Sequence, residues 1–302
     1  MSGYDPRDRL PFDLPEVDYE RYTNRQLAAV PLALLVLALA VIGAFYATTG
    51  APVDQGIEFT GGTELRVAAD AGADEPRAQV ESAFDVSPSS VQNVQTADGV
   101  YIVTFDQDAV QRAETPLNEQ ARAAGLDVQA QTTVSPSFGG DSQTQALAGI
   151  AVAFVGMSVL VFAMFRTFVP SIAVVVSAFS DIVIPVALMN VLGIELTLGT
   201  VAALLMLIGY SVDSDILLNN HILRRSGDFY ESTYRAMRTG VTMTLTSLSA
   251  MAVMALTATL FGVELLASIG LILVFGLATD LLNTYMLNLS LLRWYKYEGV
   301  AR

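Results

Sequence analysis

The chain has 302 residues, of which 53% are hydrophobic and only 15% are charged, a composition too apolar for an ordinary soluble protein. It carries 30 acidic and 16 basic side chains, a formal net charge of −14, and we expect no nucleic acid among its partners. There is no cysteine, so disulfides and thiolate metal sites are excluded.

Six apolar runs are long enough to cross a bilayer at about 20 residues per crossing. They lie at 27–47, 144–165, 170–192, 197–220, 240–261 and 264–291. We therefore predict a cytoplasmic N-terminal tail, a first span, an outer domain, five further spans and a cytoplasmic C-terminal tail, at 1–26, 27–47, 50–143, 144–292 and 293–302.

The basic residues predict the orientation, because short cytoplasmic segments collect Lys and Arg. With the N-terminus inside, 12 of the 16 basic residues lie in cytoplasmic segments and the other four in the long outer segment. A cleaved signal peptide is the alternative for the first span, but about 26 mostly polar residues precede it and no clear A-x-A site follows. We expect a multi-pass protein of the cell membrane with both termini in the cytoplasm.

The outer segment is strongly acidic. Residues 50–143 hold 15 acids and 4 arginines, a net charge of −11. One interpretation is a vestibule that attracts cations; the other is a carboxylate-rich surface adapted to strong salt. Because the whole chain has a single lysine, we favour the second and predict a halophilic, archaeal source.

The same segment has the pattern of a folded α+β domain. Alternating residues predict strands at 63–69, 91–96, 100–105 and 127–134. Helical spacing predicts helices at 74–84 and 108–125, the second kinked or split by Pro116. "FTGGT" (59–63) lacks the lysine of a phosphate loop and predicts a tight turn. The order β-α-β-β-α-β is the ferredoxin-like arrangement. The predicted fold is an all-α six-helix transmembrane bundle with one extracytoplasmic α+β ferredoxin-like domain.

The fourth span contains two aspartates in the stretch "LIGYSVDSDILLNN" (207–220). A charge at mid-membrane costs roughly 2.5–3.5 kcal/mol on insertion scales, so a functional reason is expected. At about 100° per residue, Asp213 and Asp215 point roughly 200° apart. Asp215 aligns with Ser211 and Asn219, whereas Asp213 aligns with a glycine and lies near mid-membrane. Depth favours Asp213 as the group that handles an ion, because a deeper carboxylate is more strongly desolvated.

Other spans carry matching polar residues, which predict a seam shared by helices three to six. The ion-coupling candidates are Asp181, Asp213, Asp215, Asp280 and Arg238. The further residues of the seam are Ser211, Asn219, Thr242, Thr246 and Asn283. The alternative for the hydroxyls is bonding to their own backbone, and for the aspartates it is pairing with a partner subunit. We expect no catalytic residue, metal site or cofactor.

Several motifs together resemble one family. The resemblance rests on four segments: "GIEFTGGTELRV", "FRTFVPSIAVVVSAFSDIVI", "LTLGTVAALLMLIGYSVDSDILL" and "MRTGVTMTLTSLSAM". It is to the SecD/SecF family of protein-export membrane proteins, on its SecF side. The resemblance covers nearly the whole chain. It departs from the usual bacterial form, in which Asn-Asp-Ser or Asn-Asp-Thr replaces Asp213-Ser214-Asp215, so that the bacterial aspartate falls on Ser214.

The resemblance implies an auxiliary subunit of Sec protein export, not an enzyme, within the resistance-nodulation-division superfamily. In such proteins a membrane carboxylate takes up and releases a proton or Na⁺, and the outer domain moves in response. Arg238 matches the family's arginine at the start of the fifth span. The implied partners are SecD, the Sec translocon channel, the exported polypeptide and membrane lipid. The alternatives are an ion-coupled solute exporter, which usually has two six-helix halves, and an intramembrane aspartyl protease, whose motifs the spans lack.

Overall fold

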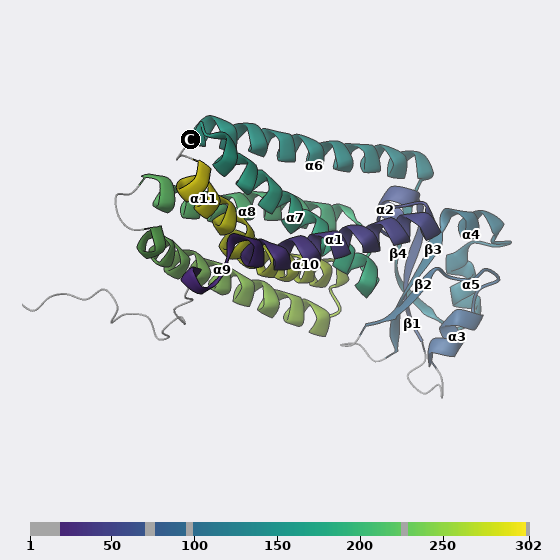
Figure 1. Ribbon diagram of the computed structural model, residues 1–302. Helices are drawn as coiled ribbons and strands as arrows, with labels where there is room; N and C mark the ends of the chain where they lie inside the picture. The colour runs from purple at the N-terminus through teal and green to yellow at the C-terminus, as the bar shows by residue number, and fades with distance from the viewer. Residues whose placement is uncertain (1–18, 70–75, 95–98, 225–228, 300–302) are drawn as a thin grey trace, which may run out of the picture.

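The computed structural model describes residues 19–69, 76–94, 99–224 and 229–299, which form a long helical bundle with a small sheet domain at one end (Figure 1). After a 3₁₀ turn, η2 (Tyr19–Arg21), the bundle helices are α1 (Asn24–Thr49), α6 (Pro136–Phe165), α7 (Phe168–Leu192), α8 (Leu198–Arg224), α9 (Phe229–Leu260) and α10 (Glu264–Leu282). The chain continues as a π-helical segment η3 (Asn283–Asn288), α11 (Leu289–Trp294) and a second π-helical segment η4 (Tyr295–Gly299).

Six helical stretches among the described residues are long and apolar enough to cross a membrane, the last of them running from α10 into η4. The molecule is therefore a multi-pass membrane protein. Their ends follow local signals. Thr23 and Gln26 form a capping box at the start of α1. Gly193 ends α7 in the left-handed conformation, and Gly262 makes the short turn between α9 and α10.

Two of these helices extend well beyond the apolar runs that mark them in the sequence. Helix α6 begins at Pro136 instead of near 144, and α9 begins at Phe229 instead of near 240. The physical reason is that hydropathy marks the part of a helix that lipid surrounds, whereas backbone hydrogen bonding continues into polar residues. Ser135 caps α6 with Pro136 at its first position, which is a normal helix start.

The outer domain has the predicted ferredoxin-like arrangement. Its strands form an antiparallel sheet in the order β2-β3-β1-β4, with bounds β1 (Gly62–Ala68), β2 (Ser90–Asn93), β3 (Val100–Asp106) and β4 (Asp127–Val134). The helices are α3 (Pro76–Ser82), α4 (Gln107–Arg112) and α5 (Leu117–Ala123), so the helix predicted at 108–125 is split before Pro116, as expected. Residues 95–98, between β2 and β3, lie outside the described residues.

The core of this domain forms between the sheet and its helices. Leu65, Val103 and Phe105 from the sheet are fully buried against Val80 of α3 and Ala121 of α5. These residues alternate along β1 and β3, which is why the period-two pattern predicted the strands. Burial of these apolar side chains stabilises the sheet domain as a core separate from the helical bundle.

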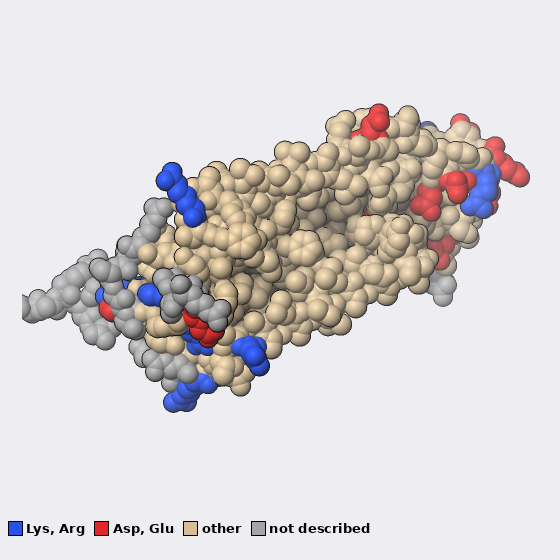
Figure 2. All heavy atoms as spheres, turned by 45° about the horizontal axis from the view of Figure 1, so that its top comes forward, with Lys and Arg blue, Asp and Glu red and all other residues tan. Residues whose placement is uncertain are grey.

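Charge is distributed unevenly along the molecule. In Figure 2, acidic side chains gather over the outer domain and basic side chains over the opposite end of the bundle, with a broad band between them that shows neither. Such an uncharged band is expected of the lipid-facing surface of six membrane-spanning helices.

Candidate functional site

The bundle interior contains three fully buried aspartates. Asp181 of α7 is 1% exposed and lies opposite α8 and η3. Its Oδ2 accepts a hydrogen bond of 2.6 Å from the Ser211 hydroxyl, and its Oδ1 accepts one of 2.6 Å from the Asn283 amide. Both bonds are short, and both donors are neutral.

The other two aspartates share a hydroxyl. Asp280 of α10 accepts from Ser214 of α8 at both carboxylate oxygens, at 2.8 and 3.0 Å. Asp215 of α8 accepts at Oδ1 from Thr284 and from Asn288, each at 2.8 Å. The Thr284 hydroxyl is also 3.3 Å from Asp280 Oδ1, so it lies between the two carboxylates. Both aspartates have no exposed surface.

We call this group the carboxylate cluster: Asp181, Asp215 and Asp280 with their donors Ser211, Ser214, Asn283, Thr284 and Asn288. Within the described part of the chain, every hydrogen-bond partner of its carboxylates is a hydroxyl or an amide, and none is a basic side chain. Asp215 Oδ2 and the side-chain oxygens of Asn219, Asn283 and Asn288 are buried without a partner. Across the described residues, no three acids or histidines converge in a way that could hold a metal ion.

The π-helical segment η3 explains how one short stretch supplies three donors. In an α-helix, Asn283 and Asn288 would point about 140° apart. A π segment bonds residues i and i+5 and brings them nearer to one face, and such segments are frequent at functional sites. Thr284 follows on the same buried side. The sequence gives no signal for a π segment, and for this reason Asn288 was missed.

The structure unites some of the predicted site residues and separates others. Asp181, Asp215, Asp280, Ser211 and Asn283 meet in the carboxylate cluster. Asn219 is buried nearby and donates to the Pro170 carbonyl at 3.4 Å. The remaining predicted residues lie outside the cluster. Asp213 is exposed on the other face of α8, and Arg238 is half-buried on α9. Thr242 and Thr246 donate to backbone carbonyls of their own helix.

A second feature joins the outer domain to α8. The short helix α2 (Ile57–Thr60) leads through Gly61 and Gly62, both with positive φ, into β1. A Cβ on Gly62 would lie 2.4 Å from the Phe105 carbonyl oxygen, so this close turn requires glycine. The half-buried Glu58 in α2 accepts a hydrogen bond from the backbone N–H of Leu198, the first residue of α8.

Backbone hydrogen bonds reinforce the same junction. Gly56 N–H donates to the Leu196 carbonyl at 2.9 Å, and Leu196 N–H donates to the Asp54 carbonyl at 2.7 Å. A carboxylate at the first turn of α8 also interacts favourably with the helix dipole. The outer domain is thus fixed directly to the helix that carries Ser211, Ser214 and Asp215.

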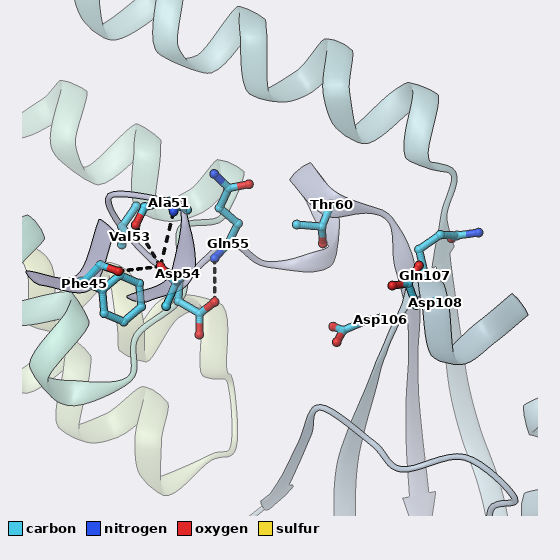
Figure 3. A pocket seen from close by; sticks show the side chains of 10 residues that line it. Phe45, Ala51, Val53, Asp54, Gln55, Thr60, Asp106, Gln107 and Asp108 are labelled. Atoms are coloured by element: carbon cyan, nitrogen blue, oxygen red, sulfur yellow. Dashed lines mark hydrogen bonds between the residues drawn. The ribbon is translucent and has the colours of Figure 1, made fainter. Parts of the chain in front are cut away.

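Acidic side chains crowd this junction. Burial, followed by the charges of Asp54, Asp106 and Glu64, raises the pKa of Glu195 above its ordinary value. Beside the junction a cleft of about 400 Å³ opens between the end of α1 and the start of α4 (Figure 3). Asp54 lies on one side of it and Asp106 and Asp108 on the other, so closing the cleft brings like charges together.

Comparisons with known proteins assign the chain to a family. The family model "Protein export membrane protein SecD/SecF, C-terminal" matches residues 116–298, and the "SecD/SecF GG Motif" matches residues 46–73. The chain belongs to the SecD/SecF family. It is similar to the protein-export membrane protein SecF of Haloferax volcanii (69% identity over 96% of this chain and 99% of the relative) and of Haloquadratum walsbyi (67% over 96% and 99%).

A solved SecDF structure from Thermus thermophilus has the same fold, with a TM-score of 0.69 at 21% identity over 95% of this chain and 40% of that one. The two SecF relatives come from halophilic archaea, so the prediction of a halophilic, archaeal type is confirmed. The chain is an auxiliary membrane component of Sec protein export. The family assignment favours this function over the exporter and the protease.

Proposed function

We propose that this export subunit binds and releases its coupling ion at the carboxylate cluster. The observation that carries the proposal is three fully buried carboxylates whose described partners are all neutral. An uncompensated buried charge costs several kcal/mol, so the three cannot remain ionised together without a bound ion. Uptake of protons or of a monovalent cation removes the excess negative charge, and release restores it.

Both ions named by the family resemblance fit the chemistry of the cluster. Protonation of Asp215 at Oδ2, which accepts no hydrogen bond, would remove one of the buried charges without breaking a contact of that atom. The amide oxygens of Asn219, Asn283 and Asn288 are equally suited to a hard cation such as Na⁺. We assign ion binding to Asp215 rather than Asp213, because the Asp215 side chain is fully buried in the bundle and the Asp213 side chain is exposed on its surface.

Transmission runs along α8 in this proposal. The helix has 27 residues and is a stiff rod of about 40 Å. Its middle contributes Ser211, Ser214 and Asp215 to the cluster, and its first residue is held by Glu58 of the outer domain. A shift of α8 that follows a change of ion occupancy would therefore move the outer domain, which in turn would act on the exported polypeptide.

Partners and orientation complete the proposal. The solved SecDF protein is much longer than this chain, which supports a complex with a SecD subunit beside the Sec translocon channel. The segments 1–26, 166–169, 221–239 and 293–302 hold 12 of the 16 Lys and Arg residues, which supports a cytoplasmic location of both termini, with the outer domain on the other side.

The test is export under an imposed ion gradient. Membrane vesicles containing the Asp215→Asn variant should lose gradient-stimulated export of a Sec substrate while retaining the basal rate. Asp127→Asn, an exposed aspartate at the start of β4, is the matched control and should behave as wild type. Imposing a proton gradient without Na⁺, and the reverse, identifies the ion. Unchanged stimulation in Asp215→Asn would contradict the proposal.

A further inference from the structure

A short segment ahead of α1 is fastened to the end of the chain. We call residues 19–23, which include η2, the strap. Arg293 of α11 is 8% exposed, and its Nη1 and Nη2 atoms donate to the carbonyl oxygens of Tyr19 at 2.9 Å and of Tyr22 at 2.7 Å. Its Nε atom donates to the side-chain oxygen of Asn24, the first residue of α1. One guanidinium group thus holds the strap and the start of α1 at three points.

The strap inserts one aromatic side chain into the bundle. Tyr19 is 9% exposed, and its hydroxyl lies 3.4 Å from the sulfur of Met237. It packs in an apolar layer that four other elements supply: Leu218 and Ile222 of α8, Phe229, Ala236 and Val241 of α9, Tyr285 of η3, and Leu289 and Leu292 of α11, with Leu27 of α1. Tyr22 is 49% exposed, so the two tyrosines of the strap face in opposite directions.

This apolar layer directly adjoins the carboxylate cluster. Leu218 follows Asp215 by three residues toward the end of α8, which lies nine residues, or about 14 Å, beyond that aspartate. On the last membrane helix, Leu289 follows Asn288, whose amide donates to Asp215 at 2.8 Å. Tyr19 packs against both leucines. It therefore lies between the cluster and the end of the bundle that carries both termini.

We propose that the strap is the cytoplasmic gate of the carboxylate cluster. With Tyr19 seated, the apolar layer excludes water and ions from this side, since hydrophobic constrictions close a path by dewetting. Arg21, Tyr22 and Thr23 are exposed, so the strap depends on one buried side chain and on the bonds from Arg293. Segments with so few buried contacts open at the lowest cost. The inference rests on the proposed ion binding and orientation, and it names the device that regulates access.

The gate is also linked to the outer domain. The capping box of Thr23 and Gln26 starts α1 immediately after the strap. Shortly beyond the other end of this helix, the Asp54 carbonyl accepts the 2.7 Å hydrogen bond from Leu196 N–H at the junction with α8. A displacement of the outer domain that moves α1 along its axis would therefore withdraw or seat Tyr19. Access to the cluster from the cytoplasm would change with the position of the outer domain.

The gate can be tested by the chemical accessibility of Asp215 in the full chain, co-expressed with SecD in membrane vesicles. The probe is a membrane-impermeant quaternary-ammonium carbodiimide with glycine ethyl ester, and mass spectrometry measures the modification rate of the carboxyl group. Inverted vesicles present the cytoplasmic side, and right-side-out vesicles present the other. Tyr19→Ala should accelerate modification from the cytoplasmic side roughly tenfold, because loss of a buried contact of about 1.4 kcal/mol raises the open population by that factor. The rate from the outer side should not change.

The matched control lies in the same strap. Tyr22→Ala removes an exposed tyrosine and should leave both rates as in wild type. Tyr19→Phe retains the ring and should also resemble wild type. Arg293→Lys retains the charge but loses the planar fork that spans the three acceptors, so it should accelerate cytoplasmic modification even with Tyr19 present. This variant decides the question if Tyr19→Ala does not fold.

The outcomes separate the gate from a structural role. Unchanged rates in both Tyr19→Ala and Arg293→Lys would overturn the gate. So would acceleration from both sides, which indicates general loosening of the bundle, or from the outer side alone. Failure of the proposed ion binding has a different signature, because Asp215→Asn would then keep its gradient-stimulated export whatever the strap variants do.

Discussion

The carboxylate cluster predicts strong coupling between Asp215 and Asp280. Their Oδ1 atoms lie 2.8 and 3.3 Å from the Thr284 hydroxyl, so they are at most about 6 Å apart. At an effective dielectric constant of about 20, two unit charges at 6 Å repel by about 3 kcal/mol. Ionisation of one carboxylate therefore depends on the state of the other.

Substituting either residue by Asn removes this repulsion and changes the ion occupancy of the remaining carboxylate. The double variant Asp215→Asn/Asp280→Asn should consequently be non-additive by up to about 3 kcal/mol, or roughly 100-fold in the gradient-stimulated rate. The measurement is the initial rate of export of a Sec substrate into vesicles, with matched amounts of folded protein, for wild type, both single variants and the double variant.

A second cycle provides the control. Asp213 points away from the cluster, so Asp213→Asn and Asp280→Asn should combine additively to within about 0.5 kcal/mol, or about twofold in rate. Independent losses for Asp215 and Asp280, or equal non-additivity in the control cycle, would refute the shared-hydroxyl geometry as the source of coupling.

Three further predictions concern the junction and the topology. Glu58→Ala should remove the cap of α8, which costs about 1 kcal/mol of stability and lowers stimulated export. Glu58→Gln should retain part of both the stability and the export, and the exposed control Glu81→Ala should change neither. Stability is measured by thermal unfolding in detergent. Because the pKa of Glu195 is raised in the folded protein, the junction should be most stable below the ordinary glutamate pKa of 4.5 and should weaken as pH rises above it. Amide hydrogen exchange at the junction measures this pH dependence of stability, which Glu195→Gln should flatten. Single cysteines replacing Ser90 and Ser226, the latter outside the described residues, should react with an impermeant maleimide from opposite sides of the membrane; reaction of both from one side would refute the assigned orientation.

The outer domain was the most predictable part of the molecule. Strands β1 and β3 alternate between buried and half-buried positions, and β4, which does not alternate in burial, was predicted with its exact bounds, 127–134. Pro116 prevents a continuous helix, because its ring clashes with the preceding turn and its nitrogen has no hydrogen to donate. This effect can be predicted from the sequence alone. The order of strands in the sheet also followed from the order of elements, because the ferredoxin-like arrangement has one connectivity.

The carboxylate cluster was only partly predictable. Periodicity placed Ser211 and Asp215 on one stripe of α8, and the structure buries both. Periodicity cannot tell which side of a helix meets its neighbours. Depth in the membrane therefore favoured Asp213 as the ion-binding residue, whereas helix packing leaves its side chain on the surface of the bundle. Asn288 owes its position to the π segment, whose geometry departs from the 100° step of an α-helix. The cap by Glu58 joins residues 140 apart in sequence and has no local signal.

The motif in α8 differs from the bacterial form at a position that contacts Asp280. In the usual bacterial form an aspartate stands at the position of Ser214, and in this chain that position holds a hydroxyl. Ser214 donates to both carboxylate oxygens of Asp280, so the acid supplied by α10 lies within 3.0 Å of the Ser214 hydroxyl. A carboxylate thus lies at this point of the bundle, and α10 carries it. Because Ser214 Oγ also lies 2.9 Å from the Ser211 carbonyl oxygen, its single proton can serve the helix or the acid but not both fully. The hydroxyl therefore links Asp280 of α10 to α8, the helix held by Glu58 at the outer domain.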